Sequence, residues 1–161
     1  MSFDVTTIRS CFPALRAGVA HFDGPGGSQT PEAVARAVHD AMLTPIANRG
    51  VVTAAERNAD GIVHAARAAM GDLLGTDPRG VVFGRSMTQL TFDLARTLAQ
   101  TWSTGDEVLV SRLDHDANVR PWVIAARDAG ATVRWIDFDP SSGELSLEQV
   151  TSLLGERTRL V

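Results

Sequence analysis

The chain has 161 residues, of which 44% are hydrophobic and 21% are charged, and its formal net charge is -4. This is the composition of an ordinary globular protein with enough apolar residues for a core. The negative charge and the lack of a basic cluster exclude a nucleic-acid surface. No apolar run approaches the ~20 residues that a membrane span needs, and the N-terminal MSFDVTTIRS lacks a signal-peptide core. We therefore expect a cytoplasmic protein with no nucleic-acid or membrane partner.

Two residue types are nearly or wholly missing. Cys11 is the single cysteine, so an internal disulfide is excluded, and its helical spacing from Ile8, Phe12 and Leu15 predicts a small buried side chain. All fifteen basic residues are arginine, and the sequence contains no lysine. Chemistry that requires a lysine amine therefore cannot come from these residues alone.

The first part of the chain predicts helices joined by glycine-rich turns. A short amphipathic helix interrupted by Pro13 is expected within residues 1–20, and residues 19–23 are strand-like. The loop Gly24 to Gln29 follows, and then a helix with Thr30 as its cap and Pro31 at its first position. A glycine-rich loop that enters a helix can bind phosphate. This loop does not fit GxGxxG, however, so a simple turn is the main alternative.

The second part of the chain alternates strands and helices. A loop at 43–53 and a long helix at 54–74 precede it. The expected elements are a strand at 80–83, a helix at 87–101, a strand at 107–111, a helix at 121–129, a strand at 132–136, a helix at 147–154 and the start of a strand at 159–161. Short connections and helical crossovers predict parallel, right-handed βαβ units, and so an α/β fold with a mostly parallel sheet.

Two loops at the carboxyl ends of these strands carry candidate binding groups. Ser86, Met87 and Thr88 open the helix after the strand at 80–83, where free N–H groups and two hydroxyls could hold a phosphate. The alternative is that Ser86 only caps the helix, with Gln89 completing a capping box. His115 follows the strand at 107–111, at the edge of a sheet where ligands bind. A loop histidine solvated by its acidic neighbours is the alternative there.

The segment 107–122, EVLVSRLDHDANVRPW, carries a resemblance to a known family. It resembles the motif after the second large-domain strand of class V, fold-type I pyridoxal-phosphate enzymes, the cysteine desulfurase group. The matching pairs are Asp114-His115, Ala117-Asn118 and Pro121-Trp122. Asp116 stands where some members have a second histidine, which places the chain in a desulfurase-like side branch.

The resemblance implies a cofactor, pyridoxal 5′-phosphate, and roles for residues on two loops. His115 would stack on the cofactor ring and assist catalysis. Ser86-Met87-Thr88 is similar to the family element that binds the cofactor phosphate, so the three residues are expected to be cofactor-binding.

The resemblance also implies a substrate side and an assembly. Gly24 and Pro25 are similar to a turn that borders the amino-acid substrate. Asn48 and Arg49 loosely resemble a segment that reaches the active site of a partner subunit, with a solvated turn as the alternative. Members of the family are usually homodimers with shared active sites, so a homodimer is expected.

The family requires two groups that the sequence does not contain. Its cofactor is held as a Schiff base on a lysine, and an aspartate pairs with the pyridine nitrogen; both lie further along the chain in the family. We therefore expect the N-terminal part of a longer enzyme, inactive alone, with a substrate-side segment at 1–50 and the first half of the cofactor-binding domain at 51–161. The strand at 81–83 would pair with a later strand, so a lone fragment would leave sheet edges unpaired.

Several functions remain open. Desulfurase, selenocysteine lyase, kynureninase-like and aminotransferase chemistry are not distinguished, with cysteine as one candidate substrate. The lack of lysine favours a second class, a non-catalytic pseudoenzyme or an α/β interaction module. A Rossmann-type dinucleotide binder is a weak third alternative because no glycine fingerprint follows any of the strands.

Overall fold

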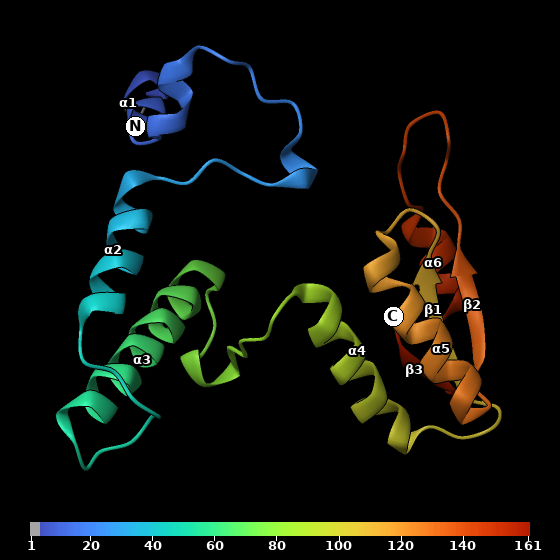
Figure 1. Cartoon of the computed structure of the whole chain (residues 1–161). Helices are drawn as coiled ribbons and strands as arrows, with labels where there is room; N and C mark the ends of the chain where they lie inside the picture. Colours follow the sequence, from blue (N-terminus) through green and yellow to red (C-terminus); the bar gives the residue numbers. More distant parts are fainter. Residues whose placement is uncertain (1–3) are drawn as a thin grey trace. The chain divides into compact units, whose positions relative to one another are not determined.

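The computed structural model describes residues 4–161, which form two compact units (Figure 1). The first unit ends at Val81, and the second spans Val82–Val161. A division at residue 50, expected from the sequence, stays a prediction.

The first unit is helical. Its elements are α1 (Val5–Ser10), η1 (Pro13–Ala17), η2 (Gly24–Gly26), α2 (Glu32–Leu43), α3 (Ala54–Leu74) and η3 (Pro78–Gly80). Helix α2 begins one residue later than expected, with Pro31 as its N-cap. The strand expected at 19–23 is absent, because these residues find no pairing partner among the described ones. The prediction that Cys11 is buried is also wrong: α1 has no buried residue, and the thiol is exposed.

Helix α3 holds the preceding loop in place. Its first turn carries a capping box, in which Thr53 accepts from the Glu56 N–H and the Glu56 carboxylate accepts from the Thr53 N–H. Arg57 donates to the backbone carbonyls of Val51 and Val52, each at 3.0 Å. The loop at 44–53 is therefore irregular, as expected, but it is fastened to one helix by specific contacts.

The second unit is an α/β structure. Its elements are α4 (Met87–Leu98), η4 (Ala99–Thr101), β1 (Glu107–Ser111), η5 (Asp116–Asn118), α5 (Arg120–Ala129), β2 (Thr132–Ile136), α6 (Leu147–Leu153) and β3 (Thr158–Leu160). The sheet has the order β2-β1-β3, and both pairings are parallel. The α/β class and the parallel βαβ connections predicted from the sequence are confirmed.

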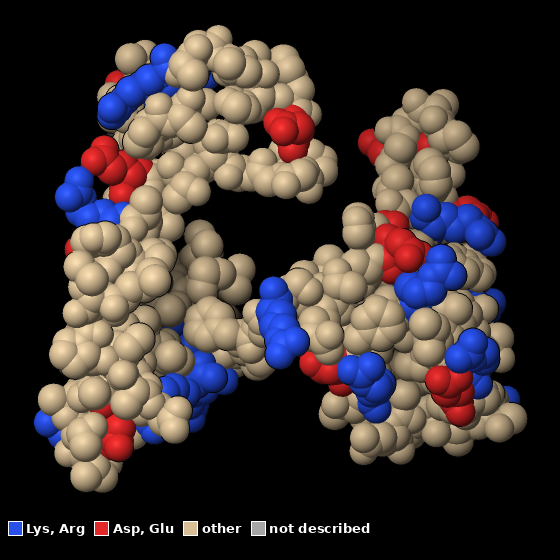
Figure 2. All heavy atoms as spheres, in the orientation of Figure 1, with Lys and Arg blue, Asp and Glu red and all other residues tan. Residues whose placement is uncertain are grey.

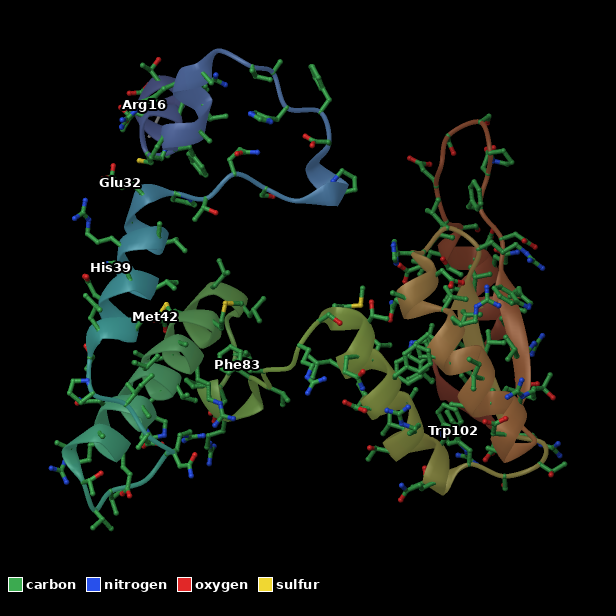
Figure 3. The ribbon with its side chains drawn as sticks, viewed as in Figure 1. Arg16, Glu32, His39, Met42, Phe83 and Trp102 are labelled. Carbon is green, nitrogen blue, oxygen red and sulfur yellow. The ribbon has the colours of Figure 1, made fainter. Side chains whose placement is uncertain are left out.

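The core of this unit lies between the central strand and two helices. Val108 and Val110 of β1 are buried because β1 has a neighbour on both sides and helices above it. They form a cluster with residues of α4, α5 and the turn before α5: Ala95, Val119, Trp122, Ala125 and Ala126. Trp102, in the connection from α4 to β1, packs against this cluster (Figure 3).

The strand expected at 80–83 is not part of the sheet. Val81 is buried, but Val82 and Phe83 are 66% and 50% exposed, and the segment runs as an irregular connection into α4 (Figure 3). The apolar run predicts a strand, yet a strand requires a neighbour. Among the described residues β1 is flanked by β2 and β3, and Val82 and Phe83 pair with neither of these two edge strands.

The surface of the second unit carries both signs of charge. Figure 2 shows arginine and acidic side chains side by side, in agreement with the ion pairs Arg112–Asp137, Arg120–Asp116 and Arg127–Asp128. Within residues 4–161, no helix is both long and apolar enough to cross a bilayer.

One buried carboxylate joins β3 to the turn before β1. Asp106, 5% exposed, accepts from the Ser103 N–H and from Nε of Arg159, each at 2.8 Å. The Ser103 N–H, together with the Arg159 guanidinium, holds the pKa of Asp106 below its ordinary value, although burial opposes this. A carboxyl whose pKa is lower in the folded state stabilises the fold above its unfolded pKa, and this stabilisation is lost as the pH falls through the folded value.

We expect Asp106→Asn to lower the melting temperature at pH 7, because the amide cannot replace the charge that Arg159 and the Ser103 N–H bind. The variant should also lose less of its stability than the parent chain between pH 5 and pH 2, since the carboxyl that titrates is gone. Thermal melts followed by circular dichroism across this range measure both effects. The control is Asp128→Asn, an exposed carboxylate paired with its neighbour Arg127; equal behaviour of the two variants would contradict the role of Asp106.

Candidate functional site

The N-terminal turn of α4 is open to ligands. Ser86 caps the helix, and its Oγ accepts from the Gln89 N–H at 3.2 Å. The Gln89 side chain donates to Asp93 instead of returning to the cap, so the capping box considered from the sequence is not formed. The N–H groups of Met87 and Thr88 have no partner within the helix, and Ser86, Met87 and Thr88 are all exposed. This turn presents partial positive charge and a Thr88 hydroxyl.

A glycine sets the approach of the chain to this turn. A Cβ built on Gly84 would lie 2.6 Å from both Cγ and Cδ2 of Leu90, which is closer than real Cβ atoms come to other atoms. A side chain at this position would therefore require Leu90 to shift from its present rotamer.

The imidazole of His115 is held by its own loop. His115 is the N-cap of η5, and the Ala117 N–H donates to its Nδ1 at 3.0 Å. Because Nδ1 accepts this bond, a neutral ring carries its proton on Nε2. His115 is an exposed residue, so packing against other side chains does not hold its ring. The ring is therefore oriented although it is not buried.

Hydrogen bonds to one serine and one aspartate hold the loop between β1 and His115 in place. Oγ of Ser111, the last residue of β1, accepts from the N–H groups of Leu113 and Asp114, each at 3.0 Å. The Asp114 carboxylate accepts from the His115 N–H and from Nδ2 of Asn118, each at 2.6 Å. Nε1 of Trp122 in turn donates to Oδ1 of Asn118 at 3.2 Å.

The two loops meet at one hollow. A cavity of about 420 Å³ is lined by Ser86 and Met87 from the start of α4 and by Asn118 and Trp122 from the segment after His115. Helix α4 also packs against η5, the turn that His115 caps. The structure thus brings the predicted phosphate turn and the His115 segment to one place, although Thr88 and His115 are not themselves among the lining residues of this hollow.

Asn118 and Trp122 are functional candidates that entered the family resemblance from the sequence but received no role there. Both also line a second hollow of about 570 Å³ at the carboxyl end of β1, together with Ser111 and Asp114. They therefore form the wall between two hollows. The spacing of four residues from Asp114 to Asn118 and from Asn118 to Trp122 is the signal that could have indicated them.

The expected substrate-side residues lie in the first unit. Gly24 and Pro25 are exposed in η2. Asn48 is exposed in the loop before α3, where Arg49 is ion-paired with Asp60 at 2.6 Å. These four residues lie in a different compact unit from Ser86 and His115, and their contact with a substrate stays a prediction.

The residues present fit one end of pyridoxal phosphate. The first turn of α4, twelve residues long, offers the unpaired N–H groups and hydroxyls that a phosphate binds. The chain has no lysine, so the covalent attachment of the aldehyde cannot come from these residues. Among residues 4–161 no cluster of three or more histidine, cysteine or acidic side chains could hold a metal ion.

Comparison with known proteins identifies the family model and the relatives that this chain resembles. The family model described as Aminotransferase class-V matches residues 20–161. An uncharacterised protein from Mycobacterium tuberculosis is 39% identical over 100% of this chain and 40% of its own length. A probable cysteine desulfurase from Pseudomonas aeruginosa is 35% identical over 95% of this chain and 39% of its own length. The crystal structure of the cysteine desulfurase CsdA from Escherichia coli has a TM-score of 0.82 and 26% identity over 99% of this chain and 41% of CsdA.

The chain therefore spans about 40% of the length of these relatives. The matches confirm the resemblance to the desulfurase group and the fold-type I α/β architecture expected from the sequence.

We expect Gly84→Ala to destabilise the chain by about 1 kcal/mol, because the new Cβ would force the Leu90 side chain out of its present rotamer. Urea denaturation followed by circular dichroism measures the change.

The matched control is Gly155→Ala, because a Cβ there would meet no atom within 4 Å and Gly155 does not have a positive φ. Its stability should stay within about 0.5 kcal/mol of the parent chain. If Gly84→Ala proves as stable as Gly155→Ala, the close approach of Leu90 does not constrain the turn.

Proposed function

Because this chain belongs to the aminotransferase class-V family, we propose that it forms the cofactor-binding first part of a pyridoxal-phosphate enzyme that acts on an amino acid. The observation that carries the proposal is the hollow shared by the start of α4 and the segment after His115. A phosphorylated aromatic ring needs an anion site and a flat neighbour close together. We assign the first to the start of α4 and the second to His115, whose segment reaches the hollow through Asn118.

The first turn of α4 is the proposed phosphate site. The N–H groups of Met87 and Thr88 and the Thr88 hydroxyl would donate to the phosphate oxygens, while the helix dipole favours the negative charge. Ser86 fixes the turn because its Oγ already accepts from the Gln89 N–H. Arg85, immediately before the turn and exposed, adds a positive charge nearby.

The proposed role of His115 is to stack on the cofactor ring and to hold a proton at Nε2. Its Nδ1 is occupied by the Ala117 N–H, so Nε2 is the atom that could donate to a substrate or leaving group. When bound, the cofactor supplies the electron sink for breaking a bond at the α or β carbon of the amino acid.

The substrate and the assembly are further parts of the proposal. Cysteine is the favoured substrate, since relatives that match most of this chain bear the name cysteine desulfurase. The lysine that binds the cofactor aldehyde would come from residues outside this sequence. A homodimer, with Gly24, Pro25, Asn48 and Arg49 on the substrate side, is the proposed form of the complete enzyme.

The absence of lysine from the chain favours one other function, that of a non-catalytic member of the family. Such a protein would keep the fold and bind a phosphorylated ligand without transforming it. Experiments that separate binding from covalent attachment distinguish the two functions.

We expect the chain to bind pyridoxamine 5′-phosphate more tightly than pyridoxamine, because the site recognises the phosphate and this ligand needs no lysine. Amide resonances of Met87, Thr88 and Gln89 should shift in titrations followed by nitrogen-proton NMR. Thr88→Val should weaken binding by about tenfold or more, since a hydrogen bond to a charged group contributes ~1.5–3 kcal/mol.

The control is Thr97→Val, which removes a hydroxyl from the last turn of the same helix, where it donates to the Asp93 carbonyl. Its affinity for the phosphorylated ligand should match that of the parent chain. Equal binding of the two ligands, or shifts confined to residues away from α4, would remove the basis of the phosphate site.

A second experiment uses protein from the complete gene mixed with pyridoxal phosphate. A visible absorbance band that disappears when one lysine is replaced by alanine supports the enzyme, and sulfide release from cysteine tests the favoured substrate. A complete protein that binds the phosphate but gives no such band is the non-catalytic member.

A further inference from the structure

Three residues spaced four apart link the His115 loop to the core. Nε1 of Trp122 donates to Oδ1 of Asn118 at 3.2 Å, and Nδ2 of Asn118 donates to Oδ2 of Asp114 at 2.6 Å. The other oxygen of Asp114 accepts from the His115 N–H at 2.6 Å. The Ala117 N–H then donates to the ring of His115.

We propose that Asn118 and Trp122 are positioning residues for His115. Because the indole of Trp122 is buried and fixed, the hydrogen bonds through Asn118 and the Asp114 carboxylate restrain the exposed imidazole of His115. The inference rests on the proposed function only for the reason why His115 must be held in place. The positioning itself is a property of the chain without cofactor.

The buried end of this link is rigid. Trp122 is 7% exposed and lies in the core cluster, and it belongs to the first turn of α5. The indole nitrogen is a donor only, so the Asn118 side chain must turn its oxygen toward Trp122. That choice leaves the Asn118 NH₂ group facing Asp114, and the orientation of the amide is therefore determined by chemistry.

The exposed end has few other restraints. The described contacts that hold His115 are the Asp114 carboxylate on its N–H, the Asn118 N–H on its carbonyl at 2.8 Å, and the Ala117 N–H on its ring. All three depend on the conformation of residues 114–118, because the donors and acceptors lie within that segment. Asn118 closes the segment by joining its last residue to its first.

The other three histidines are His21, His39 and His64. Nδ1 of His21 lies 3.4 Å from the Gln29 NH₂ group, which only donates, so this nitrogen also accepts. Two of the three have carboxylate partners instead. Nδ1 of His39 lies 3.0 Å from the Asp40 carboxylate, and Nδ1 of His64 lies 3.5 Å from that of Asp60. A carboxylate only accepts hydrogen bonds, so Nδ1 of His39 and of His64 favours carrying a proton. Nδ1 of His115 instead accepts a hydrogen bond and is bare. The tautomer of His115 is thus a spectroscopic signature of the positioning, and His39 and His64 serve as references in the same sample.

A ring that stacks on a cofactor must keep one plane, and a ring that transfers a proton must keep it on one nitrogen. An exposed histidine without restraint would sample several rotamers and both tautomers. The link from Trp122 supplies this restraint without covering the face of the imidazole. It therefore suits a residue that must stay accessible and still be fixed.

The test is nitrogen-15 NMR of the histidine rings in the chain at pH 8.5, where neutral imidazoles show separate shifts for protonated and bare nitrogens. In the parent chain, Nδ1 of His115 should resonate as a bare nitrogen. In Asn118→Ala the ratio of the Nε2–H to the Nδ1–H form of His115 should fall by roughly fivefold, which corresponds to the ~1 kcal/mol of one net hydrogen bond. The ratios for His39 and His64 should not change.

Asn118→Asp is the sharper variant because it keeps an acceptor for Trp122 and replaces only the NH₂ group, placing a carboxylate against Asp114. It should lower the same ratio while the indole N–H resonance of Trp122 stays near its parent position, which shows that the core is intact. Asn58→Ala, which removes an amide bound to the Pro45 carbonyl in the first unit, is the control and should leave His115 unchanged.

An unchanged His115 ratio in both Asn118 variants overturns the proposal, as does a fall of the same size in Asn58→Ala. The measurement involves no cofactor. A chain that shows the His115 signature but fails to distinguish pyridoxamine 5′-phosphate from pyridoxamine therefore keeps the positioning link and loses the proposed function. A chain that prefers pyridoxamine 5′-phosphate but shows an unchanged His115 ratio in the Asn118 variants supports the phosphate site and contradicts the positioning role.

Discussion

The burial of β1 between two parallel neighbours is the constraint on which the second unit depends. Val108 and Val110 enter the core because β2 and β3 pair with both edges of the strand and α4 and α5 pack against it. A central strand cannot slide without breaking two sets of hydrogen bonds and moving its apolar side chains to the wrong face. The end of β1, and with it the loop that carries His115, is consequently fixed by the packing of the core beneath the candidate site.

The sequence predicts an element well when the information is local. The bounds of β1, β2 and α3 agree with those expected from apolar runs, periodicity and capping residues. The prediction fails at 80–83, where a suitable run of apolar residues finds no neighbouring strand among the described residues. It also fails for Cys11, which was expected to be buried but is exposed. Burial and strand pairing depend on partners, and a single segment does not specify them.

The same distinction holds for the candidate site. Ser86 could be recognised from sequence because a helix cap is encoded within four residues, and the structure shows the bond to the Gln89 N–H. His115 could be placed because it follows a strand. The wall that Asn118 and Trp122 form between two hollows could not, because it depends on how α5 lies on the sheet. The spacing of four residues between Asn118 and Trp122 indicates a helix-like repeat, but it does not predict the hollows on either side of them.

The hydroxyl of Ser111 decides the direction in which the chain leaves the sheet. Its Oγ accepts from the N–H groups of Leu113 and Asp114. Because the exit from β1 is set by a side chain of that strand and both its edges are already paired, strands added at the outer margins of the sheet would leave this exit undisturbed. The sheet could thus widen during evolution while the loop above its centre kept the same path.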